Sequence, residues 1–132
     1  TSEEFISMEY PAVADYRMVR ALIDACEKLG LIYHLGVVRT HDAYYMESPL
    51  AHGDFYARIK PWQEMSILAI ENESSALFTI CSMQGVRAGA IFACGYPIYQ
   101  PDADNCDWDS YIKNMVLAGI EAAKLLNHRG LA

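Results

Sequence analysis

The sequence predicts an α/β fold, with a mixed, mainly parallel sheet flanked by helices. Helical and strand patterns alternate along the chain, and the predicted strands are nearly continuous apolar runs, which is typical of strands that helices cover on both faces. The chain has 132 residues, of which 53% are hydrophobic, and this is enough for one domain with its own core. We therefore expect residues 1–132 to form a single domain.

The first predicted helix is followed directly by a strand. Residues 10–30 form the clearest helix, because Gly30 stands where a left-handed C-terminal cap belongs. The apolar residues of this helix recur at helical spacing: Val13, Tyr16, Val19, Leu22, Ile23 and Cys26. Residues 31–40 are rich in branched and aromatic side chains and predict a strand, in which His34 is expected to pack into the core. Residues 41–54 predict a loop.

The middle of the chain repeats this order of helix and strand. Residues 55–65 predict a short helix interrupted by Pro61, and residues 66–72 predict a buried strand. Residues 74–85 predict a further helix, which ends at a glycine. A helix between two strands is the connection that parallel strands require.

The last part of the chain is predicted to hold a third strand and a long helix. Residues 86–95 predict the strand. The acidic residues 102–110 predict a solvated, N-capping start to a helix over residues 111–127. The spacing of its apolar residues predicts the face that this helix buries: Ile112, Met115, Val116, Gly119, Ile120, Ala123 and Leu126.

Composition excludes several classes of partner. The chain has 10 Lys and Arg against 17 Asp and Glu, and a net charge of -7 repels nucleic acids and anionic membrane surfaces. No segment approaches the roughly 20 apolar residues that cross a bilayer. The four cysteines form no C-x-x-C pair, so they predict reduced core residues in a soluble cytoplasmic protein without a metal site: Cys26, Cys81, Cys94 and Cys106.

Two glutamates interrupt an apolar run at the point where strand character changes to helix character. They are Glu71 and Glu73, and they follow a strand at its carboxyl end, where sheets of this kind bind ligands. In one interpretation an acid here, or Ser74, caps the free N–H groups of the first helical turn. In the other, one acid caps while the second points into the cleft and accepts hydrogen bonds from a vicinal diol such as ribose.

Two stretches carry a resemblance to a known family. They are "YPAVADYRMVRALIDACEKLGLIYHLGVVRTHDAYY" and "LAIENESSALFTICSMQGVRAGAIFA", in which "ENESSALF" and "GVRAGA" stand at a specific spacing. Over nearly its whole length the chain resembles the C-terminal half of the uridine phosphorylase branch of the nucleoside phosphorylase family. The resemblance implies the α/β fold of that family. It also implies its reaction, in which phosphate attacks C1′ of the ribose and the base departs.

The resemblance implies that four residues bind the substrate: Glu73, Glu71, Asn72 and Tyr44. The last glutamate of the family's E-M-E motif binds the ribose hydroxyls, and Glu73 matches it. Glu71 stands beside it, and Asn72 occupies the methionine position against the sugar. Tyr44 matches the aromatic residue that stacks on the base. The implied ligands are a nucleoside, and phosphate as a co-substrate, with no further cofactor and no metal, while the catalytic residues stay unknown.

The chain departs from the family in the parts that hold phosphate and read the base. Family members carry roughly as much chain again before the matching region, and that half holds a glycine-rich loop and most of the phosphate-binding arginines. The glutamine and arginine that read uracil have no counterpart here. The family motif that follows the last strand is replaced by "GYPIY".

Two classes of function remain. One is a phosphorylase of a pyrimidine nucleoside such as uridine, acting as a homo-oligomer or with a complementary N-terminal half, or a nucleosidase that uses water in place of phosphate. The other is a truncated, non-catalytic relative that serves as a nucleoside-binding or protein-binding scaffold. An exposed sheet edge or apolar face, left where the N-terminal half would pack, predicts self-association.

Overall fold

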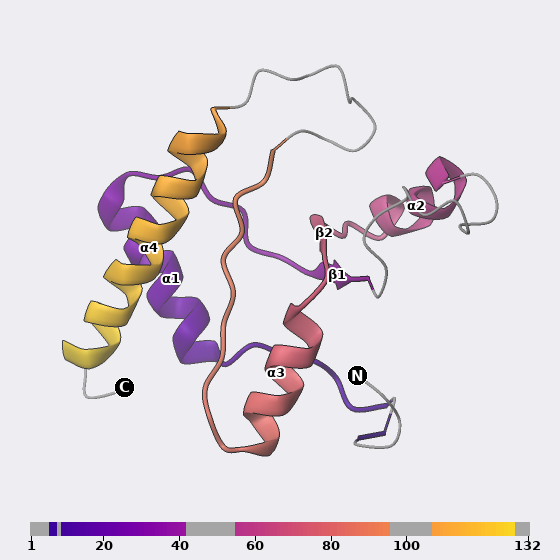
Figure 1. Ribbon diagram of the computed structural model, residues 1–132, viewed down its shortest axis with the longest axis horizontal. Helices are drawn as coiled ribbons and strands as arrows, with labels where there is room; N and C mark the ends of the chain where they lie inside the picture. Colours follow the sequence, from indigo (N-terminus) through magenta and orange to yellow (C-terminus); the bar gives the residue numbers. More distant parts are fainter. Residues whose placement is uncertain (1–5, 8, 42–54, 96–106, 129–132) are drawn as a thin grey trace.

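The computed structural model describes residues 6, 7, 9–41, 55–95 and 107–128. Helices and strands follow one another along the chain (Figure 1) as α1 (Tyr16–Leu29), β1 (Val38–Thr40), α2 (Phe55–Glu64), β2 (Ala69–Glu71), α3 (Ser74–Met83) and α4 (Trp108–His128). The two strands lie in the middle of the molecule, with α2 on one side and the pair α1 and α4 on the other. This is an α/β architecture, as predicted.

The two strands form a parallel sheet. Its register places Val38 opposite Ala69, Arg39 opposite Ile70 and Thr40 opposite Glu71. Both strands are shorter than the predicted ranges 31–40 and 66–72, because the ladder begins only where Leu68 N–H donates to the carbonyl of Val37 (2.9 Å). The predicted parallel pairing is confirmed, and the predicted strand lengths are wrong.

The predicted third strand, residues 86–95, is extended chain that pairs with no strand of the described residues. A strand exists only where a neighbouring strand satisfies its N–H and C=O groups. Here the Ala88 carbonyl accepts a hydrogen bond from the N–H of Asp15 (2.7 Å), just before α1. Gly89 lies so close to α1 that an added Cβ would stand 2.8 Å from Cβ of Met18. The segment packs on a helix, and the prediction of a strand is wrong here.

Helix α1 has a well-formed cap at each end. The Asp15 carboxylate accepts hydrogen bonds from the N–H groups of Arg17 (2.8 Å) and Met18 (3.2 Å), which the helix itself leaves without partners. At the other end Gly30 has φ 65°, a left-handed conformation that suits glycine because it carries no Cβ. The predicted cap at Gly30 is confirmed.

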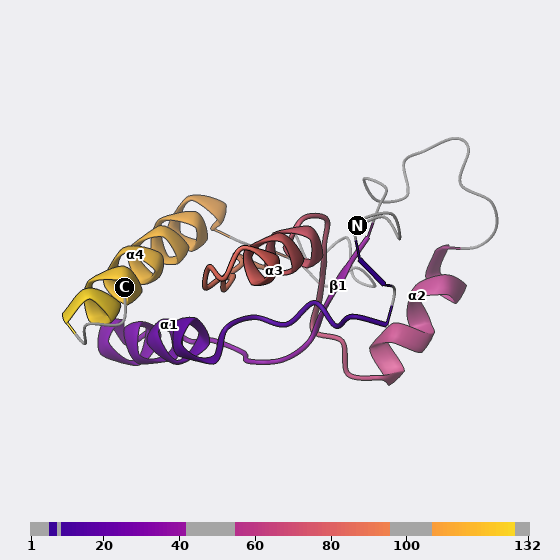
Figure 2. The same cartoon turned by 90° about the horizontal axis from the view of Figure 1, so that it is seen from below.

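The core lies between α1 and α4, which run side by side in both views (Figures 1 and 2). The buried cluster between them consists of Ala21 and Ala25 of α1 with Ala122 and Leu126 of α4, so three of its four side chains are alanines. Met18, Leu22 and Leu125 pack against this cluster. The predicted faces are partly wrong, since Tyr16 is 76% exposed and Val116 is 50% exposed. Periodicity identified the helices and correctly selected Cys26 and Leu126, but it missed the buried alanines.

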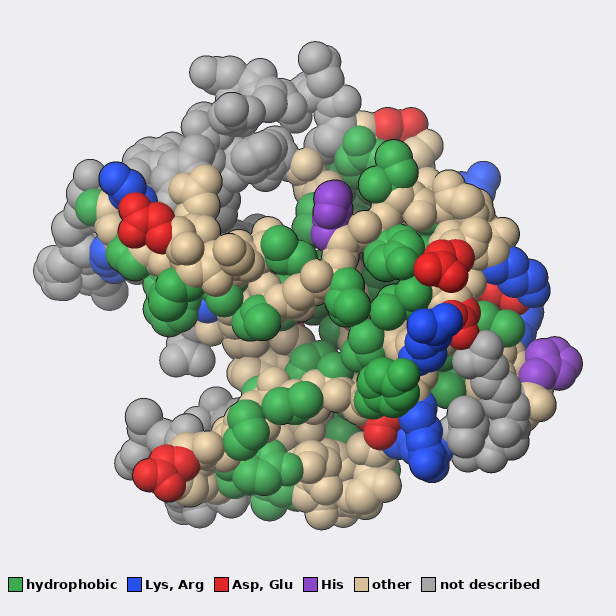
Figure 3. Space-filling model, turned by 180° about the vertical axis from the view of Figure 1, so that it is seen from behind, with side chains coloured by type: hydrophobic (Ala, Val, Ile, Leu, Met, Phe, Trp, Pro, Cys, Tyr) green, Lys and Arg blue, Asp and Glu red, His purple; other side chains and the backbone are tan. Residues whose placement is uncertain are grey.

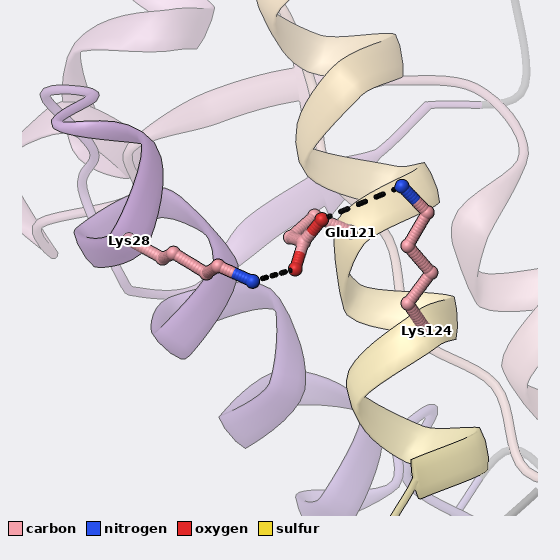
Figure 4. A network of polar contacts seen from close by, with 3 residues as sticks. All are labelled: Lys28, Glu121 and Lys124. Atoms are coloured by element: carbon pink, nitrogen blue, oxygen red, sulfur yellow. Dashed lines mark hydrogen bonds and ion pairs between the residues drawn. The ribbon is translucent and has the colours of Figure 1, made fainter.

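A charged contact joins the same two helices at their edge (Figure 4). Lys28 of α1 donates to the Glu121 carboxylate of α4 (Nζ to Oε1, 2.5 Å), and Lys124 lies 3.7 Å from the other oxygen. The hydrogen bond from Lys28 is the main reason that the pKa of Glu121 lies below its usual value. The Lys28 side chain is largely exposed, so we expect this ion pair to stabilise the fold only weakly.

The predicted break in α2 is wrong, whereas the predicted N-cap of α4 is present. Helix α2 runs from Phe55 to Glu64 and continues through Pro61, although proline donates no N–H to the helix. Trp62 of this helix stacks under the Arg39 guanidinium of β1, 4.5 Å from ring centroid to Cζ. At the start of α4, the Asp107 carboxylate accepts hydrogen bonds from the N–H (3.2 Å) and the hydroxyl (2.7 Å) of Ser110. The predicted N-capping role of this acidic loop is confirmed at Asp107.

Two predictions of buried residues are wrong. His34 is exposed, as are its neighbours Tyr33 and Leu35 in the segment that leads into β1. Of the cysteines in the described ranges, all are free thiols, but only Cys26 is buried, and Cys94 is exposed. Burial raises the pKa of the Cys26 thiol. Within the described ranges, no helix is both long enough and apolar enough to cross a membrane.

Candidate functional site

The candidate site lies where the two parallel strands end and α3 begins. Thr40 is the last residue of β1 and Glu71 the last residue of β2, and the register places them opposite each other. The chain then passes through Asn72 and Glu73 into α3 at Ser74. Since the carboxyl ends of parallel strands meet at one edge of the sheet, residues from both strands and from the helix start gather there.

Glu71 is the acid that caps the helix. Its side chain is buried, with 7% of the residue exposed. One carboxylate oxygen, Oε2, accepts hydrogen bonds from the N–H groups of Glu73 (2.8 Å) and Ser74 (2.6 Å). The other oxygen, Oε1, accepts a hydrogen bond from the Thr40 hydroxyl. Negative charge is favoured at this position because the free N–H groups and the helix dipole are positive there.

Opposing effects act on the pKa of Glu71. Burial disfavours the charged carboxylate and raises its pKa, whereas hydrogen bonds from the side chains of Thr40 and Ser74 and from the N–H groups of Ser74 and Glu73 lower it. The hydrogen bonds together outweigh burial, so the pKa lies below the usual value of 4.5. Glu71 is therefore a fixed anion in the folded protein.

Glu73 is exposed and leaves its carboxylate available. The residue occupies the N-cap position of α3, yet its own side chain makes no capping hydrogen bond. Within the described residues, its carboxylate accepts one hydrogen bond, from the N–H of Asn72 at 3.3 Å. The two acids therefore differ in role: Glu71 caps, and Glu73 faces solvent beside the strand ends.

The structure brings three of the four predicted site residues together. Glu71, Asn72 and Glu73 are consecutive on the turn between β2 and α3. Tyr44 lies outside the described residues, as does all of the predicted loop 41–54 except His41. No group of three or more His, Cys, Asp and Glu side chains in the described parts of the chain could hold a metal ion.

Thr40 belongs to the site, and sequence reasoning missed it. Its hydroxyl donates to Glu71, accepts from the N–H of Ser75 (3.1 Å), and lies 3.3 Å from Oγ of Ser74. A signal was available in the pattern, since Thr40 ends the first predicted strand just as the run of acids begins at the end of the second. Parallel pairing brings two such ends together.

Comparison with known proteins supplies the family. The family model described as the Phosphorylase superfamily matches residues 3–128. The chain belongs to this superfamily. It is similar to the uridine phosphorylase of Thermococcus kodakarensis, with 32% identity over 132 residues that cover 96% of this chain and 46% of the relative.

Two further relatives are a guanosine phosphorylase and a second uridine phosphorylase. The guanosine phosphorylase of Halorubrum lacusprofundi is 32% identical over 123 residues, which cover 93% of this chain and 48% of that protein. The uridine phosphorylase of Treponema pallidum is 37% identical over 95 residues, 69% of this chain and 37% of that protein. The chain thus spans less than half the length of each of these relatives, and it has part of a nucleoside-phosphorylase-like α/β fold.

Proposed function

We propose that this chain provides the ribose-binding part of a nucleoside phosphorylase, and that Glu73 accepts hydrogen bonds from the ribose hydroxyls. The observation that carries the proposal is the difference between the two acids of the β2–α3 turn. Because Glu71 satisfies the helix start, Glu73 has an exposed carboxylate at the sheet edge where ligands of parallel sheets bind. One carboxylate can accept from two adjacent hydroxyl groups.

The proposed reaction is phosphorolysis. An oxygen of phosphate forms a bond to C1′ of the ribose while the bond from C1′ to the base nitrogen breaks, and the base leaves with that electron pair. Positive charge develops on the sugar ring, and carboxylates close to the sugar stabilise such charge. Glu73 would hold the ribose, and its negative charge would favour this step.

The proposed substrate is a pyrimidine nucleoside such as uridine, together with phosphate and no further cofactor. Several relatives are named uridine phosphorylase, which supports uridine, while the relative named guanosine phosphorylase makes guanosine the first alternative to test. Tyr44 is proposed to stack on the base and Asn72 to lie against the sugar. A role in pyrimidine salvage and a cytoplasmic location belong to the same proposal.

The test is chromatographic detection of free base from uridine, thymidine, guanosine, adenosine and inosine, each with and without phosphate. Release that requires phosphate supports a phosphorylase, whereas release without phosphate identifies a nucleosidase. Glu73→Gln is expected to abolish release, because the ribose loses its charged acceptor. Activity that survives in Glu73→Gln would contradict the role of Glu73.

A matched control uses an acid of similar exposure away from the site. Glu64→Gln removes one exposed negative charge at the end of α2 and is expected to keep the turnover of the unmodified chain. If Glu64→Gln and Glu73→Gln reduce turnover equally, the loss reflects net charge. A selective loss in Glu73→Gln supports ribose binding.

A second candidate function is nucleoside or protein binding without turnover. The observation that favours it is the apolar surface of the described residues, where Ile32 is 94% exposed and Val37 is 66% exposed. We propose that another polypeptide covers this surface, either a second copy of the chain or a complementary half. Nucleoside binding without base release from any substrate would favour this candidate.

A further inference from the structure

The inference concerns Thr40 and starts from its hydrogen bonds. A threonine hydroxyl has one proton to donate and two lone pairs to accept with. In this structure the Thr40 hydroxyl donates to Glu71 and accepts from the N–H of Ser75 at 3.1 Å. It therefore connects the end of β1 to both the end of β2 and the first turn of α3.

Together, Thr40 and Glu71 hold three consecutive N–H groups. Glu71 accepts from the N–H groups of Glu73 (2.8 Å) and Ser74 (2.6 Å), and Thr40 accepts from that of Ser75. These are among the N–H groups that the start of a helix leaves without partners. The backbone of Glu73 is thus fixed by a buried carboxylate and a half-buried hydroxyl, although its own side chain is exposed.

We propose that Thr40 and Glu71 are positioning residues for Glu73, an inference that rests on the proposed function. Neither residue needs to touch the nucleoside. Recognition of two adjacent hydroxyls by one carboxylate needs that carboxylate to be held within a fraction of an ångström, and rigid neighbours supply this precision. Thr40, at the end of a different strand, ties the turn that carries Glu73 to the sheet.

The experiment measures how strongly the full chain prefers a ribonucleoside to its 2′-deoxy analogue. Titration calorimetry with uridine and 2′-deoxyuridine gives two dissociation constants, and their ratio reports how well the carboxylate meets the diol. If a variant is less stable, a smaller fraction of the protein is folded, and both apparent dissociation constants rise by the same factor. This factor cancels in their ratio. The ratio therefore responds to positioning and not to stability.

The unmodified chain is expected to bind uridine about tenfold or more tightly than 2′-deoxyuridine. The deoxy analogue lacks the 2′-hydroxyl and therefore loses a hydrogen bond to the charged Glu73 carboxylate. Thr40→Val keeps the shape of the side chain but removes the hydroxyl, and it is expected to bring the ratio close to one. Thr40→Ser keeps the hydroxyl and is expected to restore the ratio. Gly30→Ala, which weakens α1 away from the site, is expected to leave the ratio unchanged.

The outcomes separate this inference from the proposed function. If the unmodified chain shows no preference for uridine, the ribose-binding role of Glu73 fails, and the positioning role fails with it. In a second outcome, the unmodified chain prefers uridine to 2′-deoxyuridine, Glu73→Gln loses this preference, and Thr40→Val keeps it. This outcome overturns only the positioning role. Loss of the preference in Thr40→Val with recovery in Thr40→Ser supports the inference.

Discussion

Glu71 combines a buried position with a full negative charge. A carboxylate removed from water is costly unless hydrogen bonds replace its hydration, and Glu71 accepts them from Thr40, Glu73 and Ser74. Its negative charge also complements the start of α3. A residue of this kind makes stability depend on pH.

We expect Glu71 to stabilise the protein above about pH 4.5 and to lose that effect in acid. Its folded-state pKa lies below the usual 4.5, so near and below that pH the unfolded state binds more protons and stability falls as the pH falls. Glu71→Gln should cost about 1–3 kcal/mol of unfolding free energy at pH 7. Urea unfolding of both proteins from pH 7 to pH 3 should show this difference shrinking towards acid.

The neighbouring acid provides the control. Glu73 is exposed and has no capping hydrogen bond, so Glu73→Gln is expected to change stability by no more than about 0.5 kcal/mol. A stability difference between the unmodified chain and Glu71→Gln that stays the same at every pH would contradict the charged role of Glu71.

The sequence placed these acids correctly and left their roles undecided. Capping rules look for a side chain at the N-cap residue itself, which here is Glu73. The carboxylate that caps belongs to Glu71, two residues earlier at the end of β2, and it reaches the helix because the strand runs directly into α3. Which of two nearby acids turns inward depends on the path of the backbone between them.

At the scale of the helix, the cap at Gly30 predicts a backbone effect. Gly30 has φ 65°, and a Cβ added there would meet no atom within 4 Å. Gly30→Ala is therefore expected to cost about 1–2 kcal/mol through backbone strain alone. Thermal or urea unfolding measures this cost.

The matched control is another glycine with open space around it. Gly119 lies within α4 and has no atom within 4 Å of an added Cβ. Gly119→Ala is expected to stabilise the protein by about 0.5–1 kcal/mol, because alanine favours a helix interior. If Gly30→Ala and Gly119→Ala change the unfolding free energy by the same amount and in the same direction, alanine causes no backbone strain at the left-handed cap.

A third glycine tests the packing of the extended segment 86–95 on α1. An added Cβ at Gly89 would lie 2.8 Å from Cβ of Met18 and 3.7 Å from its carbonyl carbon, and neither atom can move away by rotating a side chain. Gly89→Ala should cost about 1–3 kcal/mol, as overpacking does elsewhere. Unfolding curves that match those of the unmodified chain would mean that the segment is not held against the helix.

Helix positions were predictable from the sequence, but buried faces were not. Periodicity and the glycine cap identified α1, and the acidic start identified α4. The face that each helix buries depends on its partner, and close contact between α1 and α4 selects alanines such as Ala21 and Ala122. A hydrophobicity pattern gives greater weight to larger residues such as Tyr16 and Val116, which are exposed.

At the scale of the whole molecule, the core is small and the apolar surface is large. None of the large side chains in the described ranges is fully buried. Hydrophobic side chains spread across the middle of the face in Figure 3, and most charged side chains lie towards its edge.

The predicted third strand shows what the sequence alone does not reveal about pairing. Residues 86–95 have the composition of a strand, but no strand of the described residues lies beside them. Such a strand cannot be recognised as unpaired from its own sequence.

The apolar surface of the described residues includes one exposed face of α4. A substitution on this face tests whether the face binds another polypeptide. Ile112, Val116 and Ile120 lie on one helical face and are 46%, 50% and 49% exposed. If copies of the chain associate through this face, Val116→Lys should weaken association by about tenfold or more, because a charge would have to be buried. Sedimentation velocity over a range of protein concentrations measures this change.

The control must add the same charge to the same helix outside that face. His128, the last residue of α4, is exposed and lies about 120° around the helix from Val116, so His128→Lys is expected to leave association unchanged. Weakening in Val116→Lys alone assigns the interface to the apolar face, whereas equal weakening in both variants points to net charge. If the unmodified chain sediments as a monomer at high concentration, self-association through this face is wrong. A complementary half then becomes the remaining partner for the surface.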